Sequence, residues 1–181
     1  MVRVIELERE KVHECCRQVD PNEINVSIAM YFSNDQHIIS GQKDAVDEVC
    51  KLAKEQGARW ALKLPSGGGF HNLICKPVME DARPVFESYE FKEAMYLVYS
   101  CVDGRGSSSG ERIKERISTQ ISKPVLWDSL VLNLRKDGIE RIIELGSGST
   151  VSGNTRIIDP ALECRWVNNT KDLCEVLELL L

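Results

Sequence analysis

The sequence has 181 residues, of which 43% are hydrophobic and 28% charged, and its formal net charge is −5. A chain of this length can bury a sizeable core without disulfides or a structural metal. Its acidic balance, without any dense run of Lys or Arg, argues against a nucleic-acid groove, and no window of about 18 apolar residues is present to span a membrane.

Cysteine usage indicates the compartment. There are seven cysteines, an odd number, and none forms a C-x-x-C pair. Such scattered thiols are typical of a reduced, intracellular protein. The N-terminus has no basic region followed by an apolar run, so no secretion signal is expected. We therefore expect a cytoplasmic protein.

Hydrophobic periodicity divides the first 65 residues into strand, helix, strand, strand, helix and strand. These elements are expected at residues 2–6, 8–19, 24–32, 37–39, 42–56 and 59–64. The alternation in the second strand places Ile24, Val26, Ile28 and Met30 on one face. The order predicts a ferredoxin-like βαββαβ unit, with a four-stranded sheet and two helices on one side. That unit alone assigns no function.

After a glycine run, helices and strands are predicted to alternate. A helix is expected at 72–88, a buried strand at 94–102, a loop at 103–110, helices at 111–121 and 124–137, a strand at 141–145, a helix from about 150, a strand at 164–167 and a helix at 171–180. This alternation predicts a parallel sheet flanked by helices. Three strands make an incomplete sheet, whose edge would need further strands to cover it.

The stretch Lys63–Asn72 contains three consecutive glycines and then His71. Glycines without Cβ atoms allow a positive φ or a close approach of the backbone to a ligand. A histidine can change its charge near neutral pH, which suits proton transfer. A buried, structural histidine is the alternative interpretation.

Two further motifs could carry chemistry. Gly106–Gly110 fits G-x-S-x-G, which would make Ser108 a nucleophile, but the motif needs a strand that leads directly into a helix. The composition around Ser108 is instead that of a flexible loop. Gly146–Ser149 lies between a strand and a helix, where a phosphate could bind, yet it lacks the P-loop lysine and the third glycine of a dinucleotide fingerprint, so a tight turn is favoured.

Candidate metal ligands stand at two places. His71 is expected to open the next helix, and if that helix extends so far back, His71 and Cys75 would share one of its faces. His13 stands near Cys15 and Cys16. Zinc sites need three or four ligands, and neither group supplies them. No metal site is predicted.

Six stretches, in order along the chain, resemble the malonyl-CoA:acyl carrier protein transacylase family over about residues 2–160. They are Gly68-Gly69-Phe70-His71, Lys76-Pro77, Gln120, Lys123-Pro124-Val125-Leu126-Trp127, Glu144-Leu145-Gly146-Ser147-Gly148 and Ser152-Gly153. The resemblance implies that residues 1–65 are the family's ferredoxin-like subdomain and that 66–181 are the C-terminal portion of its large α/β hydrolase-like domain.

The resemblance also implies roles for two residues. His71 falls on the family's catalytic histidine, and Gln120 falls on the glutamine of Q-x-x-x-P-V-x-W, a segment that helps to orient that histidine. Three positions depart from the pattern: Gly67 replaces a serine, Ser147 a proline and Asn154 an apolar residue.

The activity that the resemblance implies is transfer of malonyl from CoA to the thiol of an acyl carrier protein, in fatty acid or polyketide synthesis. Malonyl-CoA is then a substrate, no cofactor is expected, and the partners are acyl-CoA and acyl carrier protein. The family's G-H-S-x-G nucleophile motif, carboxylate-binding arginine and oxyanion glutamine have no counterpart in this sequence. We therefore expect either a nucleophile-bearing N-terminal half or self-association.

Two other hypotheses for the function of the chain stay open. In the first, the chain is a non-catalytic scaffold that binds a carrier protein. In the second, the ferredoxin-like unit is a small-ligand or regulatory domain and the resemblance is incidental.

Overall fold

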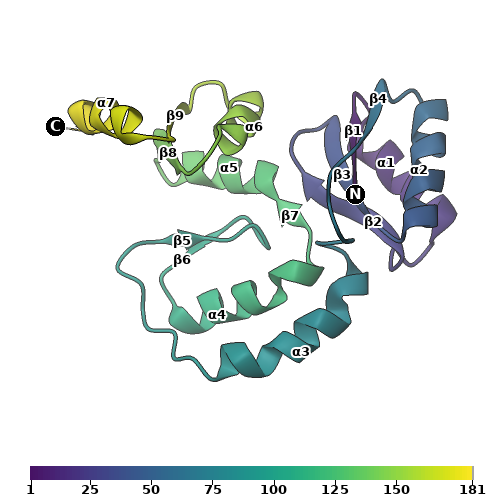
Figure 1. Ribbon diagram of the computed structural model, residues 1–181, viewed down its shortest axis with the longest axis horizontal. Helices are drawn as coiled ribbons and strands as arrows, with labels where there is room; N and C mark the ends of the chain where they lie inside the picture. The colour runs from purple at the N-terminus through teal and green to yellow at the C-terminus, as the bar shows by residue number, and fades with distance from the viewer. Residues whose placement is uncertain (181) are drawn as a thin grey trace. The chain divides into compact units, whose positions relative to one another are not determined.

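The computed structural model describes residues 1–180, which fall into two compact units (Figure 1). The first unit is Met1–Leu130, and the second begins at Val131. The division at residue 65 into a ferredoxin-like subdomain and a larger portion stays a prediction. Within residues 1–180 no helix is long and apolar enough to cross a bilayer.

Five strands of the first unit form a mixed sheet in the order β4-β1-β3-β2-β7. They are Val2–Ile5 (β1), Val26–Tyr31 (β2), Gln36–Gly41 (β3), Trp60–Lys63 (β4) and Val125–Leu126 (β7). The first four pair antiparallel in the βαββαβ arrangement that the sequence predicts, and β7 adds a short parallel pairing with β2. The predicted mixed α/β fold class is confirmed.

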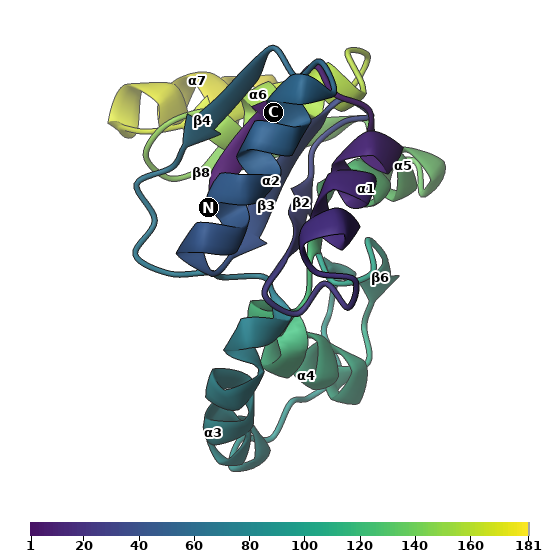
Figure 2. The same ribbon diagram turned by 90° about the vertical axis from the view of Figure 1, so that its right-hand side faces the viewer.

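The helices α1, Arg9–Val19, and α2, Lys43–Glu55, cover one face of this sheet (Figure 2). Their apolar stripes meet the inward side chains of the strands, because side chains in a strand alternate between its two faces. The completely buried core side chains include Val4, Val12, Cys16, Val26, Ile39, Val49 and Ala53. Helix α2 ends before Gly57, whose φ of +102° suits the position just after a helix.

The prediction for one face of β2 is wrong at both ends. Ile24 precedes the strand and is 47% exposed, since the strand begins only at Val26. A bulge shifts the register between Ile28 and Met30, so Met30 lies opposite Ile38 instead of continuing the inward row. Val26 and Ile28 face the core as predicted.

Residues 73–122 form helices around a small hairpin. The elements are a 3₁₀ turn Leu73–Cys75 (η1), α3 Lys76–Glu87, β5 Val98–Tyr99, β6 Gly106–Ser107, α4 Gly110–Thr119 and a second 3₁₀ turn Gln120–Ser122 (η2). Helices α3 and α4 lie side by side (Figure 1). Pro77 stands in the first turn of α3, where its missing N–H costs nothing, and Pro84 lies inside the helix.

Three predictions for this region are wrong. The buried strand at 94–102 is reduced to Val98–Tyr99, and Met95 beside it is 90% exposed. The loop at 103–110 contains β6, and Ser109 caps α4 by accepting from the N–H of Arg112. The helix expected from Pro124 begins three residues later, because residues 125–126 pair with β2.

The second unit contains β8, Arg141–Leu145, and β9, Glu163–Val167, paired in parallel along their full length. Helix α5, Trp127–Lys136, leads into it; α6, Thr150–Ile158, and α7, Thr170–Leu180, complete it. Within residues 1–180 the sheet of β8 and β9 has two strands instead of the three predicted, because residues 94–102 do not pair with either of them.

The Glu144 carboxylate holds the start of α6. It accepts hydrogen bonds from the N–H groups of Val151, at 3.1 Å, and Ser152, at 2.8 Å. Partial burial raises the pKa of Glu144, but the N–H groups of Ser152 and Val151 outweigh it and bring that pKa below its usual value. The Glu144 carboxylate therefore occupies the N-terminus of α6. This is the place where the sequence offered phosphate binding as the less favoured alternative to a tight turn.

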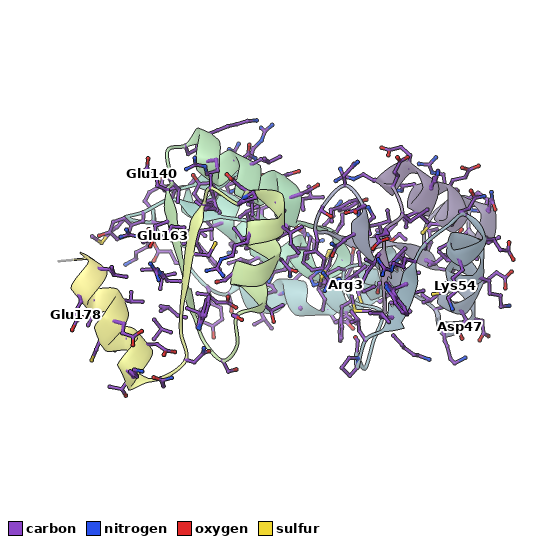
Figure 3. The ribbon with its side chains drawn as sticks, turned by 90° about the horizontal axis from the view of Figure 1, so that it is seen from above. Arg3, Asp47, Lys54, Glu140, Glu163 and Glu178 are labelled. Carbon is purple, nitrogen blue, oxygen red and sulfur yellow. The ribbon has the colours of Figure 1, made fainter. Side chains whose placement is uncertain are left out.

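We expect Glu144→Ala to lower the free energy of unfolding by about 1 kcal/mol at neutral pH, the usual effect of losing a helix cap. Since the folded-state pKa is lowered, this contribution is present above the unfolded-state pKa of about 4.3 and is lost as the pH falls through the folded-state pKa. Urea unfolding of both forms between neutral and acidic pH measures it. Glu140, labelled with Glu163 in Figure 3, is exposed, and Glu140→Ala is the matched control. Equal losses from the two substitutions would contradict this role.

Candidate active site

His71 has a left-handed backbone, with φ +58°. Its N–H donates to the carbonyl of Ile121, at 2.9 Å. The prediction that His71 begins a helix and shares a face with Cys75 is therefore wrong, because a left-handed residue cannot occupy the first helical turn. Such a conformation is costly for a residue with a side chain and is found most often at functional sites.

Close packing accounts for the third glycine of the run, Gly69. A Cβ on Gly69 would lie 2.5 Å from Cδ1 of Ile74 and 3.1 Å from the carbonyl oxygen of Gly41. The expected positive φ falls on His71 instead of the three glycines. Gly69 thus allows the loop to approach the end of β3 and so to present His71.

Two carbonyl oxygens hold the imidazole of His71. Its Nδ1 lies 3.0 Å from the oxygen of Gln120 and 3.2 Å from that of Lys123. Carbonyl oxygens only accept hydrogen bonds, so Nδ1 must carry the proton. In the neutral ring, Nε2 is then the basic nitrogen, which is the tautomer that a general base requires.

Gln120 contacts His71 through its backbone carbonyl oxygen. The residue itself is exposed. The structure therefore brings both predicted site residues together, although they are 49 positions apart in the chain. Their catalytic roles stay a prediction.

Asn72 was not predicted from the sequence to belong to the site. Its side chain is 1% exposed; its Nδ2 donates to Oγ of Ser27, at 2.7 Å, and to the carbonyl of Ser40, at 3.3 Å. Its Oδ1 accepts from the N–H of Ile74 and so caps η1. An asparagine just before an expected helix is a capping signal that could have identified it.

His71 lines a cleft of about 270 Å³ in the first unit. Its other walls come from α1, the turn before β2, β2 itself and the segment after η2, with His13, Glu23, Ser27, Tyr31, Ser122 and Lys123 among them. The cleft thus places two histidines, His13 and His71, in a lining of both polar and apolar side chains.

A second polar group lines the same cleft. Nδ1 of His13 lies 3.1 Å from Glu23, and Nε2 lies 3.1 Å from the hydroxyl of Tyr31. Burial, reinforced by Glu23, raises the pKa of Tyr31 to about 12, so the phenol keeps its proton at neutral pH. His37, fully buried beside Tyr31, has its pKa lowered by burial. No sequence pattern indicated this cluster, because its members come from separate elements.

The disfavoured nucleophile, Ser108, is exposed, and its carbonyl accepts from the N–H of Ala94. It follows the two-residue strand β6, and Ser109 separates it from α4. Among residues 1–180, no group of three or more His, Cys, Asp or Glu side chains could hold a metal ion.

The fold and this site together define a mixed α/β protein whose ferredoxin-like sheet supports a carbonyl-held histidine. The chain is homologous along its length to the C-terminal part of malonyl-CoA:acyl carrier protein transacylases. No family model matches it.

Three relatives illustrate this homology. The malonyl CoA-acyl carrier protein transacylase of Haemophilus influenzae is 29% identical over 180 residues, which cover 99% of this chain and 57% of the relative. A malonyl-transacylase solved with its type II polyketide acyl carrier protein is 30% identical, with a TM-score of 0.93, and the match covers 98% of this chain and 57% of that one.

The third is an acyl carrier protein S-malonyltransferase from Vibrio cholerae, 32% identical with a TM-score of 0.91; the match covers 97% of this chain and 57% of that structure. The chain thus spans little more than half the length of the relatives it matches.

Proposed function

We propose that this chain forms the histidine-bearing part of a malonyl-CoA:acyl carrier protein transacylase. The observation that carries the proposal is the ring of His71, whose Nδ1 is held by two carbonyl oxygens. This arrangement leaves Nε2 to exchange protons with a nucleophile and a leaving group. The homology supports the substrates, malonyl-CoA and an acyl carrier protein. No cofactor is required, because acyl transfer between thiols is proton transfer and nucleophilic substitution.

In the proposed first half-reaction, Nε2 of His71 takes the proton from a serine hydroxyl while the serine oxygen attacks the thioester carbon of malonyl-CoA. The C–S bond then breaks, and the sulfur of CoA takes the proton from Nε2. In the second half, the carrier-protein thiol gives its proton to Nε2, and its sulfur attacks the serine ester. The C–O bond breaks, and the serine oxygen recovers the proton.

The carbonyls of Gln120 and Lys123 would serve this cycle in two ways. They fix the tautomer, and their partial negative charge stabilises the imidazolium that forms when Nε2 is protonated. The serine would come from a G-H-S-x-G segment, which is not among these 181 residues.

The test is a fusion of the N-terminal part of the Haemophilus influenzae relative, which the match leaves uncovered, to residues 1–181. We expect the fusion protein to transfer malonyl from malonyl-CoA to a holo acyl carrier protein, whereas the fusion with its elbow serine replaced by alanine does not. A folded fusion protein that binds both substrates and transfers nothing would contradict the proposal.

The match to a malonyl-transacylase solved with its acyl carrier protein also supports a second candidate, a non-catalytic module that binds a carrier protein. The two candidates differ in the fusion protein, since a module of this kind would bind the carrier protein without accelerating transfer.

We also expect residues 1–181, expressed alone, to form no covalent malonyl adduct, because a general base without a positioned nucleophile cannot be acylated at a serine. Intact-mass spectrometry after incubation with malonyl-CoA measures this. A stoichiometric adduct on a serine, above all Ser108, would mean that the nucleophile lies within this sequence.

A further inference from the structure

All three carbonyls that hold His71 lie in one short segment. Ile121 accepts from the backbone N–H of His71, while Gln120 and Lys123 accept from its ring. This segment is η2 and the residue after it, and it joins α4 to β7. The orientation of the imidazole therefore depends on whatever fixes the two ends of residues 120–123.

The turn at residues 100–105 contacts both ends of this segment. On the β7 side, the carbonyl of Cys101 accepts from the N–H of Leu126, at 2.8 Å. On the α4 side, one carboxylate oxygen of Asp103 accepts from Arg116, at 3.1 Å from Nε and 2.6 Å from Nη2. Arg116 stands four residues, about one helical turn, before Gln120.

The same turn packs closely against the start of α5. Gly104 has φ +68°, and a Cβ there would lie 2.9 Å from the backbone nitrogen of Leu130. A side chain at this position would therefore push the turn away from α5. The turn is fixed against three elements, α4, β7 and α5, and the 120–123 segment lies between the first two.

Arg116 is unusually buried for an arginine on a surface helix, since it is only 5% exposed. Its Nη1 is buried and has no hydrogen-bond partner within residues 1–180, and the side chain of Asp103, with which Arg116 pairs, is 41% exposed. A buried ion pair is seldom worth more to stability than an apolar pair of the same size, so burial alone gives no reason for arginine here. What the pair does provide is a directed link between α4 and the turn, because a guanidinium bonds a carboxylate in a fixed geometry.

We propose that Asp103 and Arg116 are positioning residues for His71, acting through the 120–123 segment to keep the imidazole in the tautomer with the proton on Nδ1. The catalytic importance of this positioning role rests on the function proposed above. The effect of Asp103 and Arg116 on the tautomer of His71 does not depend on that function.

Nitrogen-15 NMR of the imidazoles in residues 1–181 tests this directly, because the sequence has three histidines, His13, His37 and His71. In the wild type we expect His71 to show one tautomer, with the proton on Nδ1. In Arg116→Met, which keeps a long side chain but removes the charge, we expect averaged shifts on both nitrogens of His71. The signals of His13 and His37 should stay unchanged, since both belong to the ferredoxin-like sheet and α1. Glu115→Gln, at an exposed neighbouring position, is the matched control.

A folded Arg116→Met variant with the wild-type His71 tautomer would overturn the proposal. If Arg116→Met shifts all three histidines or unfolds, Asp103→Ala decides, because it removes the acceptor of Arg116 and the lost side chain is partly exposed, so that packing is disturbed less. A change confined to His71 in Asp103→Ala supports the proposal, and no change overturns it.

Kinetics of the fusion protein separate this inference from the proposed function. We expect Arg116→Met to lower kcat by about 10- to 100-fold with little change in KM, the usual effect of losing a group that orients another. If His71 proves dispensable for transfer while its tautomer still depends on Arg116, the function fails and the positioning role stands.

Discussion

Replacing His71 by alanine is expected to lower turnover of the fusion protein by about 10²–10⁴-fold, the range for a positioned proton-transfer group. The side chain is partly exposed and its ring bonds only to backbone oxygens of 120 and 123, so the fold should survive. Steady-state transfer to a holo carrier protein measures the loss, and circular dichroism checks the fold.

The matched control is Gln120→Ala. The carbonyl that holds His71 remains in this variant, and the side chain that is removed is exposed, so the loss should be much smaller than for His71→Ala. Equal losses for the two variants, or full activity of folded His71→Ala, would contradict the assignment of His71 as the base.

Replacing Asn72 by alanine is expected to lower the free energy of unfolding by about 2–4 kcal/mol. The substitution leaves the carbonyl of Ser40 with one partner fewer and the N–H of Ile74 without its cap, in a site where Asn72 is 1% exposed. Because Asn72 follows His71 directly, its loss should also release the loop that carries His71 and lower turnover. Urea unfolding of residues 1–181 gives the stability, and the fusion protein gives the activity.

Asn72→Asp separates the two roles of this side chain. An aspartate can still accept from Ile74 but cannot donate to Ser27 or Ser40, and it buries a charge, so a loss clearly smaller than that of alanine would assign a share of the effect to the cap at Ile74. A loss below about 0.5 kcal/mol in Asn72→Ala would contradict the anchoring role.

The ferredoxin-like unit could be predicted from the sequence because its signals are local. Helical spacing, strand alternation and Gly57 after α2 each fix an element without help from distant residues. The failures come from longer-range pairing. Residues 125–126 form a strand only because β2 lies beside them, and the bulge before Met30 has no signature in the apolar pattern.

The apolar stretch 94–102 failed for a related reason. Its composition favours a buried strand, yet Met95, Tyr96 and Leu97 are more than half exposed, and two residues alone pair with β6. An apolar run shows what could be buried; whether it is buried depends on a neighbour that periodicity does not reveal.

The candidate site was predictable only in part. The glycine run pointed to His71, but its catalytic role and the choice of Gln120 came from family motifs, since no spacing rule joins residues so far apart in sequence. The left-handed backbone of His71, the anchoring by Asn72 and the Asp103–Arg116 link required coordinates, because each depends on elements that meet only in the folded chain.

The central claim is that His71 transfers protons during acyl transfer, and the pH dependence of kcat/KM for malonyl transfer by the fusion protein tests it most directly. Because only a neutral imidazole can accept a proton, the wild type should lose activity toward acid pH. The residual activity of His71→Ala should lack that acid limb. If His71→Ala keeps the acid limb of the wild type unchanged, another group is the base and the claim is wrong.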